Sequence, residues 1–372
     1  MFNFRKPPYP PDTAVSCYNL THIWFNFMEK LMLNSVHIKN FRLFKDFHID
    51  DLARVNLIVG KNNVGKSSLL EAISLLVNQQ APSILFELLE NRQEIVYKEG
   101  VRGYELTDLF YNRQIKSQHN MEVTITGHPG LSTRIFYQGR DNGGATREPF
   151  LGIIYKTGEE TPFSSAIRLM PELLANDDER KRQVVVSNEV NTRIITAEKP
   201  SYEQMVQIWD KGLLTSLEDD AAEMMRIIVP DLQRIANQVT NKRFIVKQKD
   251  RSPVALGSLG EGAAHIWSIA LSLSHVNNGF LLVDEIDTGL HYRVLTDVWR
   301  VVMETAVRFN VQVFATTHSY DCIRSFAEAL SLMEDNSIGV LYRLQERGEK
   351  IESRRIDAEN IIYAIVQDIE VR

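Results

Sequence analysis

The chain has little of what disulfide-bonded or membrane-spanning proteins need. Its 372 residues include only two cysteines, Cys17 and Cys322, which are far apart and show no metal-ligand spacing. Such cysteine usage is typical of a reducing compartment, so we expect a cytoplasmic protein. The longest apolar runs, around residues 69–77 and 280–283, are far too short to cross a bilayer, and we expect no membrane association.

An excess of positive charge is also lacking. The 42 Lys and Arg residues are outnumbered by 48 Asp and Glu residues, which gives a formal net charge of −6. No overall basic field therefore attracts nucleic acid. No heptad pattern is sustained, which excludes a long coiled coil. With 44% apolar and 24% charged residues, the composition is that of a globular protein with a sizeable core, and the length allows about two domains.

A phosphate-binding loop is the clearest motif that is present. Residues 60–67 match G-x-x-x-x-G-K-[ST], between a β-branched run at 55–59 and a helix-like apolar pattern at 69–77. Glycines let backbone N–H groups turn toward phosphates, Lys66 would reach the β- and γ-phosphates, and Ser67 would bind Mg²⁺. We therefore expect ATP and Mg²⁺ to bind here. The residues expected at the nucleotide are Gly60, Lys61, Asn62, Asn63, Val64, Gly65, Lys66, Ser67 and Ser68.

Two adjacent carboxylates follow an apolar run at residues 279–283. At the end of a parallel strand they would lie at the carboxyl edge of the sheet, where ligands bind in open α/β folds. Asp284 suits a Mg²⁺-binding role beside Ser67, and Glu285 suits the base that orients the attacking water. A second buried strand at 311–317 ends at His318, which we expect beside Glu285 at the same sheet edge.

A second anion-binding helix start is predicted far from the phosphate loop. Ser258 and the glycines Gly260 and Gly262 open an apolar helical stretch at residues 263–276. One nucleotide rarely needs two such sites within one chain. The economical explanation is a dimer in which Ser258 of one subunit completes the site of the other.

The order of the motifs along the chain resembles that of the ATP-binding-cassette superfamily: the phosphate loop, Ser258-Leu-Gly-Glu-Gly262, the acidic pair and Thr317-His318-Ser319. Within it, the resemblance is to the SMC-like branch that includes RecF and the OLD (overcoming lysogenization defect) ATPases. Residues 35–44 and 287–291 also resemble the first strand and the D-loop of that branch. The resemblance implies that Ser258, Gly260, Glu261 and Gly262 form a signature acting in trans, and that His318 contacts the γ-phosphate. The signature is not of the transporter type, and three residues remain alternatives for the Q-loop glutamine: Gln79, Gln80 and Gln114.

The fold class that follows is α/β, a P-loop NTPase head of ATP-binding-cassette type with a mixed α+β insertion. We assign residues 32–80 and 255–372 to the head and residues 81–254 to an inserted lid. Short strand-like runs lie at 122–126, 133–137, 152–155, 183–186 and 193–196, while residues 202–241 are helical in pattern with a break at Pro230. Residues 339–355 read as a β-hairpin followed by a helix at 358–370. The proline-rich residues 1–31 are an N-terminal extension, disordered or preceding the true start codon.

Two functions fit these observations. In the first, the protein is the ATPase of a genome-maintenance or anti-phage defence system, a dimer or higher even oligomer that controls a separate effector, such as a nuclease encoded nearby. Many OLD ATPases carry a Toprim nuclease domain; we expect none here, so that any nuclease would be a separate polypeptide. In the second, it is a stand-alone DNA-repair ATPase resembling RecF. The predicted strand at 243–247 and its flanks carry Lys242, Arg243, Lys247, Lys249 and Arg251, and because alternate residues of a strand share one face, contact with DNA stays open.

Overall fold

The computed structural model describes residues 32–78, 82–98, 101–113, 121–138, 150–157, 166–169, 192–195, 201–212 and 216–367. The extension at residues 1–31, the three glutamines considered for the Q-loop and the strand-like run at 183–186 lie outside the described residues. Within the described part of the chain, no helix is long and apolar enough to span a membrane.

A six-stranded, mostly parallel sheet carries the nucleotide motifs. Its order is β10-β14-β15-β3-β16-β17, and only the β16–β17 pair is antiparallel. Every residue of the three central strands β14, β15 and β3 is buried, as expected of a parallel sheet covered on both faces. The bounds are β10 (Thr192–Ile195), β14 (Phe280–Val283), β15 (Gln312–Thr317), β3 (Val55–Val59), β16 (Gly339–Arg347) and β17 (Lys350–Asp357). The predicted strands at 55–59, 279–283 and 311–317 and the C-terminal hairpin are thus confirmed.

A second six-stranded sheet is antiparallel, with the order β2-β1-β6-β7-β8-β9. The bounds are β1 (Ser35–Phe41), β2 (Phe44–Ile49), β6 (Met121–His128), β7 (Leu131–Gln138), β8 (Phe150–Thr157) and β9 (Ala166–Leu169). This sheet crosses the predicted boundary at residue 80, because β1 of the head pairs directly with β6 of the insert. The parallel sheet likewise takes its edge strand β10 from the insert. The division into head and insert stays a prediction.

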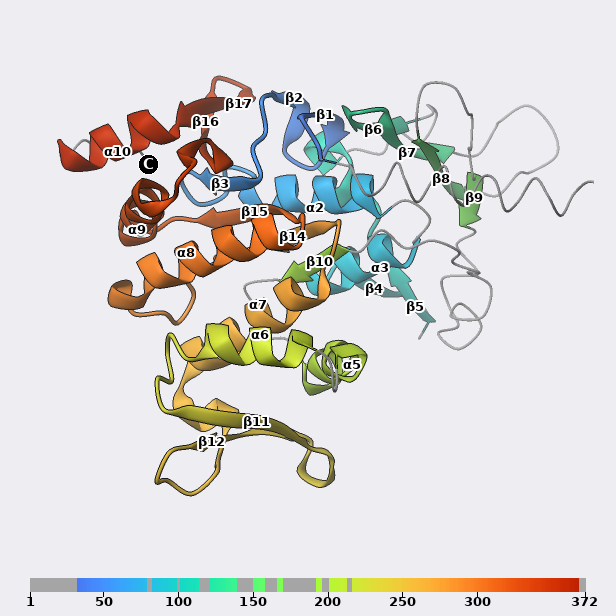
Figure 1. The fold of residues 1–372 in the computed structure, drawn as a ribbon. Helices are drawn as coiled ribbons and strands as arrows, with labels where there is room; N and C mark the ends of the chain where they lie inside the picture. Colours follow the sequence, from blue (N-terminus) through green and yellow to red (C-terminus); the bar gives the residue numbers. More distant parts are fainter. Residues whose placement is uncertain are drawn as a thin grey trace, which may run out of the picture.

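The helix that follows the phosphate loop, α2 (Lys66–Val77), lies between the two sheets (Figure 1). It contacts β6 and β7 of the antiparallel sheet and β14 of the parallel one. Thr133 on β7 donates its hydroxyl to the carbonyl of Leu75 at 3.0 Å. Because a sheet packs on each side of α2, almost every residue of this helix is buried. The same packing fixes the position of the phosphate loop at the start of the helix.

The other face of the parallel sheet is covered by helices of the C-terminal third (Figure 1). They are α7 (Glu261–His275), α8 (Tyr292–Arg308), α9 (Tyr320–Leu332) and α10 (Ala358–Val366). Trp267 on α7 and Trp299 on α8 are fully buried in this core. The helices predicted at 263–276 and from 358 onward are confirmed, and residues 368–372 lie outside the described part.

The remaining elements belong to the predicted insert. They are α3 (Pro82–Asn91), β4 (Ile95–Lys98), β5 (Val101–Tyr104), η1 (Thr107–Leu109), η2 (Tyr111–Arg113), α5 (Tyr202–Gly212), α6 (Ser216–Met225), β11 (Leu232–Gln238), β12 (Arg243–Gln248) and β13 (Val254–Ala255). The prediction of helix after Pro230 was wrong, because residues 232–238 form strand β11. Leu232 and Ile235 are buried in this strand, and its pairing with β12 outweighs the local helical pattern.

Candidate nucleotide-binding site

The phosphate loop connects β3 to α2 through two glycines that no other residue could replace. Gly60 and Gly65 have φ angles of 148° and 97°. A Cβ on Gly60 would lie 2.6 Å from the carbonyl oxygen of Leu344, and one on Gly65 would lie 2.9 Å from the ring of Phe44. The loop therefore keeps its backbone close against β16 and β2, and its shape depends on both glycines.

The side chain of Lys66 lies back over its own loop. Its Nζ donates hydrogen bonds to the carbonyls of Gly60 at 2.9 Å and Lys61 at 3.0 Å. Burial lowers the pKa of Lys66, while the carboxylates of Asp284 and Glu285 act in the opposite direction. A cation that is partly desolvated and faces two carboxylates is well placed to exchange carbonyl partners for phosphate oxygens.

The two carboxylates follow β14 and are held by the neighbouring strand β15. Oδ1 of Asp284 accepts a hydrogen bond from the hydroxyl of Thr316 at 2.5 Å. The backbone N–H of Glu285 donates to the same hydroxyl at 2.9 Å. Glu285 has a φ of 52°, in the left-handed region that non-glycine residues rarely adopt. The turn after β14 thus directs two adjacent residues to one edge of the sheet.

His318 lies at the same edge, because β15 pairs in parallel with β14 as the sequence predicted. Its Nδ1 is 3.7 Å from Oε1 of Glu285, and both side chains are half-exposed. Thr317, just before it, donates its hydroxyl to Asp287 at 2.6 Å. On the other side, Ser319 caps α9 by accepting a hydrogen bond from the N–H of Cys322. The chain is therefore fixed on both sides of the histidine.

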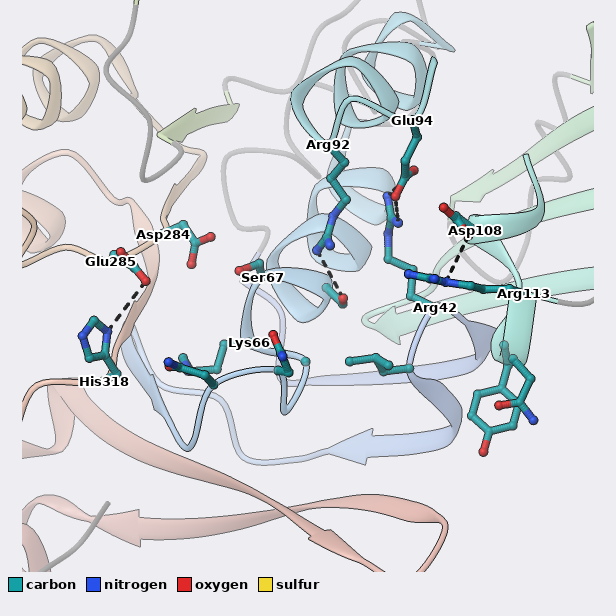
Figure 2. Close-up of a pocket in the computed structure, with 17 residues that line it drawn as sticks. Arg42, Lys66, Ser67, Arg92, Glu94, Asp108, Arg113, Asp284, Glu285 and His318 are labelled. Atoms are coloured by element: carbon teal, nitrogen blue, oxygen red, sulfur yellow. Dashed lines mark hydrogen bonds and ion pairs between the residues drawn. The ribbon is translucent and has the colours of Figure 1, made fainter. Parts of the chain in front are cut away.

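One cavity of about 840 Å³ brings most of these residues together (Figure 2). Asp284, Glu285 and His318 lie at one side of Lys66 and Ser67, and Arg42, Asp108 and Arg113 lie at the other side (Figure 2). The predicted residues that line the cavity are Asn62, Asn63, Gly65, Lys66, Ser67, Ser68, Asp284, Glu285 and His318. Gly60, Lys61 and Val64 belong to the loop without lining the cavity. No cluster of three His, Cys, Asp or Glu residues that could hold a metal ion by itself occurs in the described ranges.

A charge cluster beside the phosphate loop escaped the sequence analysis. Arg42 binds both carboxylate oxygens of Glu94, at 2.6 and 3.2 Å, and its Nε lies 2.5 Å from Glu71 as an ion pair without hydrogen-bond alignment. Arg92 donates from Nε to the other oxygen of Glu71 at 2.5 Å. Burial raises the pKa of Glu71 against the opposing effect of the two arginines. Arg42 lies within residues 35–44, which resemble the first strand of the SMC-like branch. Arg92 and Glu94 belong to no recognisable sequence motif.

The outer end of the cavity is formed by the short helices η1 and η2. Asp108, Tyr111, Asn112 and Arg113 line it, and Arg113 forms an ion pair with Asp108 at 3.1 Å. This segment is tied to the tip of β1, because the N–H of Arg42 donates to the carbonyl of Leu109 at 3.0 Å. No motif in the sequence marks these residues.

The predicted signature lies outside this cavity. Ser258 and Gly260 are exposed at the start of α7, and neither they nor Glu261 and Gly262 belong to the described cavity wall. Gly262 is buried against the loop after Glu285: a Cβ on it would lie 2.2 Å from the carbonyl oxygen of Gly289. The start of α7 is therefore fixed to the D-loop-like segment of its own chain while its exposed residues face outward.

The fold and the site define a P-loop ATPase. The family model of the AAA ATPase domain matches residues 32–126. The chain is 24% identical over 375 residues to an ATP/GTP phosphatase of Helicobacter pylori, with 89% of this chain and 97% of the relative aligned. It is 33% identical over 101 residues to the DNA double-strand break repair Rad50 ATPase of Archaeoglobus fulgidus, covering 26% of this chain and 11% of that protein.

Among solved structures, an SMC head bound to the C-winged helix domain of ScpA has a TM-score of 0.51 and 13% sequence identity, and the alignment covers 90% of this chain and all of that one. This likeness shows the fold of the head. Taken with the sequence relatives, the chain is similar to SMC- and RecF-like ATPases of the ATP-binding-cassette type.

Proposed function

We propose that this ATPase works in the cytoplasm as a dimer, or higher even oligomer, that closes around ATP. The signature residues Ser258, Gly260, Glu261 and Gly262 of one subunit complete the nucleotide site of the other. The observation that carries this proposal is the position of Ser258 and Gly260, exposed at a helix N-terminus and outside the cavity of their own chain. A helix N-terminus is a ready anion site, and here the anion would be the partner's γ-phosphate.

Within each site, the hydroxyl of Ser67 and the carboxylate of Asp284 would supply two oxygen ligands to Mg²⁺, which prefers such oxygen donors. The cation neutralises phosphate charge when it is bound. Lys66 would leave its loop carbonyls for the β- and γ-phosphates. Glu285 would orient the attacking water and accept its proton, and His318, 3.7 Å from Glu285, would contact the γ-phosphate.

In this proposal the closing and opening of the dimer controls a separate effector, such as a nuclease encoded nearby, in genome maintenance or anti-phage defence. Hydrolysis suits such a switch because ATP contributes contacts to both subunits, and loss of the γ-phosphate removes the contact with the signature. A neighbouring nuclease or toxin gene would support this role, and a neighbouring replication gene would support DNA repair instead.

The second candidate, an ATPase that acts on DNA in the manner of RecF, is favoured by one surface. On the three-stranded sheet β11-β12-β13, Arg234 and Lys247 are directly opposite each other across β11 and β12. Like charges in this arrangement repel, and a bound polyanion would relieve the repulsion. Figure 1 shows this sheet beyond α5 and α6, away from the nucleotide site.

Complementation between two inactive variants tests the dimer. Ser258→Arg should retain ATP binding but not hydrolyse ATP, because the large side chain blocks the partner's site. Lys66→Ala should lose ATP binding, since the phosphates lose their main cationic partner. In a mixture, some dimers would pair an intact phosphate loop from the Ser258→Arg chain with an intact signature from the Lys66→Ala chain, and limited hydrolysis should return.

The outcome distinguishes the models directly. Full hydrolysis by Ser258→Arg alone contradicts a signature acting in trans. The DNA alternative is tested separately by anisotropy with labelled duplex DNA over a range of salt concentrations. Arg234→Glu with Lys247→Glu should abolish binding at this sheet, whereas unchanged binding would exclude it as the DNA surface.

A further inference from the structure

Arg42 and Arg92 share the carboxylate of Glu71 but differ in what else surrounds them. The side chain of Arg42 is only 5% exposed and contacts two carboxylates, Glu71 and Glu94. The side chain of Arg92 is 37% exposed, and the carboxylate that it contacts is Glu71. Arg42 therefore has the contacts of a buried structural residue, while Arg92 is accessible from the cavity.

The guanidinium of Arg92 lies at the first turn of α2, where the phosphates of a nucleotide would lie. Its terminal NH2 group is 3.4 Å from the hydroxyl of Ser68, the residue after the expected Mg²⁺ ligand Ser67. Figure 2 shows Arg92 directed at this end of α2, between Asp284 and Arg42. Arg92 lines the same cavity as Lys66 and Ser67. A planar guanidinium at this place can bind two phosphate oxygens at once.

Because Glu71 contacts two arginines, breaking its ion pair with Arg92 costs little free energy. Glu71 is almost fully buried, and an unpaired buried carboxylate would be strongly destabilising. When Arg92 leaves, however, Glu71 keeps Arg42, which is 2.5 Å away on its other oxygen. Arg42 in turn stays bound to both oxygens of Glu94. The cluster can thus release one arginine without leaving a buried charge alone.

We propose that Arg92 is a ligand of the nucleotide's phosphates, held by Glu71 until a nucleoside triphosphate binds and then transferred to it. Arg92 is joined to the rest of the insert through the turn between α3 and β4. The transfer therefore links occupation of the phosphate loop to the position of α3 and β4. This role requires nucleotide binding at the phosphate loop but not the proposed dimer.

Equilibrium binding of a non-hydrolysable ATP analogue with Mg²⁺, measured by calorimetry, tests the proposal. Arg92→Ala should raise the Kd about tenfold to a hundredfold, the usual range for a lost charge-assisted hydrogen-bond pair. Arg92→Lys should fall in between, because it keeps the charge and loses the planar fork. Glu71→Gln should bind the analogue as tightly as wild type or more tightly, since it removes the competing partner of Arg92.

The difference between these effects distinguishes a phosphate ligand from a structural ion pair, because substitution of Arg92 should raise the Kd and Glu71→Gln should not. If Arg92 only stabilised the fold through Glu71, both Arg92→Ala and Glu71→Gln would weaken binding alike, and that result would overturn the proposal. A Kd for Arg92→Ala within about twofold of wild type would overturn it as well. Arg324→Ala is the matched control, because it removes an exposed arginine that pairs with Glu328 on α9 outside the cavity. Should Arg92→Ala fail to fold, Arg92→Lys should still raise the Kd while Glu71→Gln should not.

Discussion

The hydroxyl of Thr316 lies 2.5 Å from Oδ1 of Asp284 and donates to it. The hydroxyl oxygen of Thr316 also accepts a hydrogen bond from the backbone N–H of Glu285 at 2.9 Å, so one side chain on β15 holds both residues of the acidic pair after β14. The geometry of the pair therefore depends on the neighbouring strand as well as on its own. Since Glu285 has a φ of 52°, this support keeps its backbone in a conformation that it would rarely adopt by itself.

Thr316→Val should reduce kcat about tenfold or more while ATP binding is retained. Valine has nearly the same shape but can neither donate to Asp284 nor accept from Glu285, which leaves a partly buried N–H without its partner. Steady-state hydrolysis and analogue binding would measure the two effects. The control is Thr296→Val, which removes a threonine hydroxyl bonded to the exposed Glu328 at 2.9 Å, and it should leave hydrolysis unchanged.

Glu285→Gln should abolish turnover and preserve ATP binding. The amide keeps the size of the side chain but cannot accept a proton from water, and loss of a general base typically costs at least about a hundredfold in rate. The phosphate loop and the Asp284 carboxylate stay intact, so the Kd should change little. Single-turnover hydrolysis within about threefold of wild type would remove Glu285 from this role.

Gly262→Ala should destabilise the protein by about 1–3 kcal/mol, the usual cost of forcing an extra methyl into a packed site. The new Cβ would lie 2.2 Å from the carbonyl oxygen of Gly289, which is backbone and cannot rotate away. Gly257→Ala is the matched control, because nothing lies within 4 Å of the Cβ that it would add. Urea unfolding of both variants provides the measurement, and equal stabilities would contradict the close approach of α7 to the loop.

A dependence of stability on pH should come from His265. This residue is buried on α7, and its Nε2 lies 3.2 Å from the carbonyl of Ile286. Burial lowers the pKa of His265 below its ordinary value of 6.5, against the opposing effects of the Ile286 hydrogen bond, Asp287 and Glu261. A histidine whose pKa is lower in the folded state contributes its full stability above pH 6.5 and loses it as the pH falls toward the folded pKa.

His265→Gln removes the titrating group and can still donate to the carbonyl of Ile286. The difference in free energy of unfolding between wild type and His265→Gln should therefore shift against wild type when the pH falls from about 7.5 to about 5.5. Chemical denaturation at several pH values gives this difference. A difference that is constant over the range would show that His265 keeps its ordinary pKa in the folded protein.

The helical pattern at residues 202–241 shows where local sequence was insufficient. It predicted helix on both sides of Pro230, yet residues 232–238 form β11 because β12 offers a complete set of backbone partners and a core for Leu232 and Ile235. β-Propensity depends on such cross-strand contacts, which sequence periodicity does not contain. The strands at 55–59, 280–283 and 312–317 were predictable because each is mostly apolar or β-branched and is followed by a polar motif.

The sequence by itself determined the phosphate loop, the acidic pair and the order of the motifs, since each depends on residue types at fixed short spacing. Only the tertiary structure decided that Arg42, Arg92, Glu71 and Glu94 meet beside α2, because they come from three separate segments: the turn after β1, helix α2 and the turn between α3 and β4. It also decided that the antiparallel sheet crosses from head to insert through the pairing of β1 with β6. Contacts between distant segments depend on packing, and packing follows from the fold as a whole.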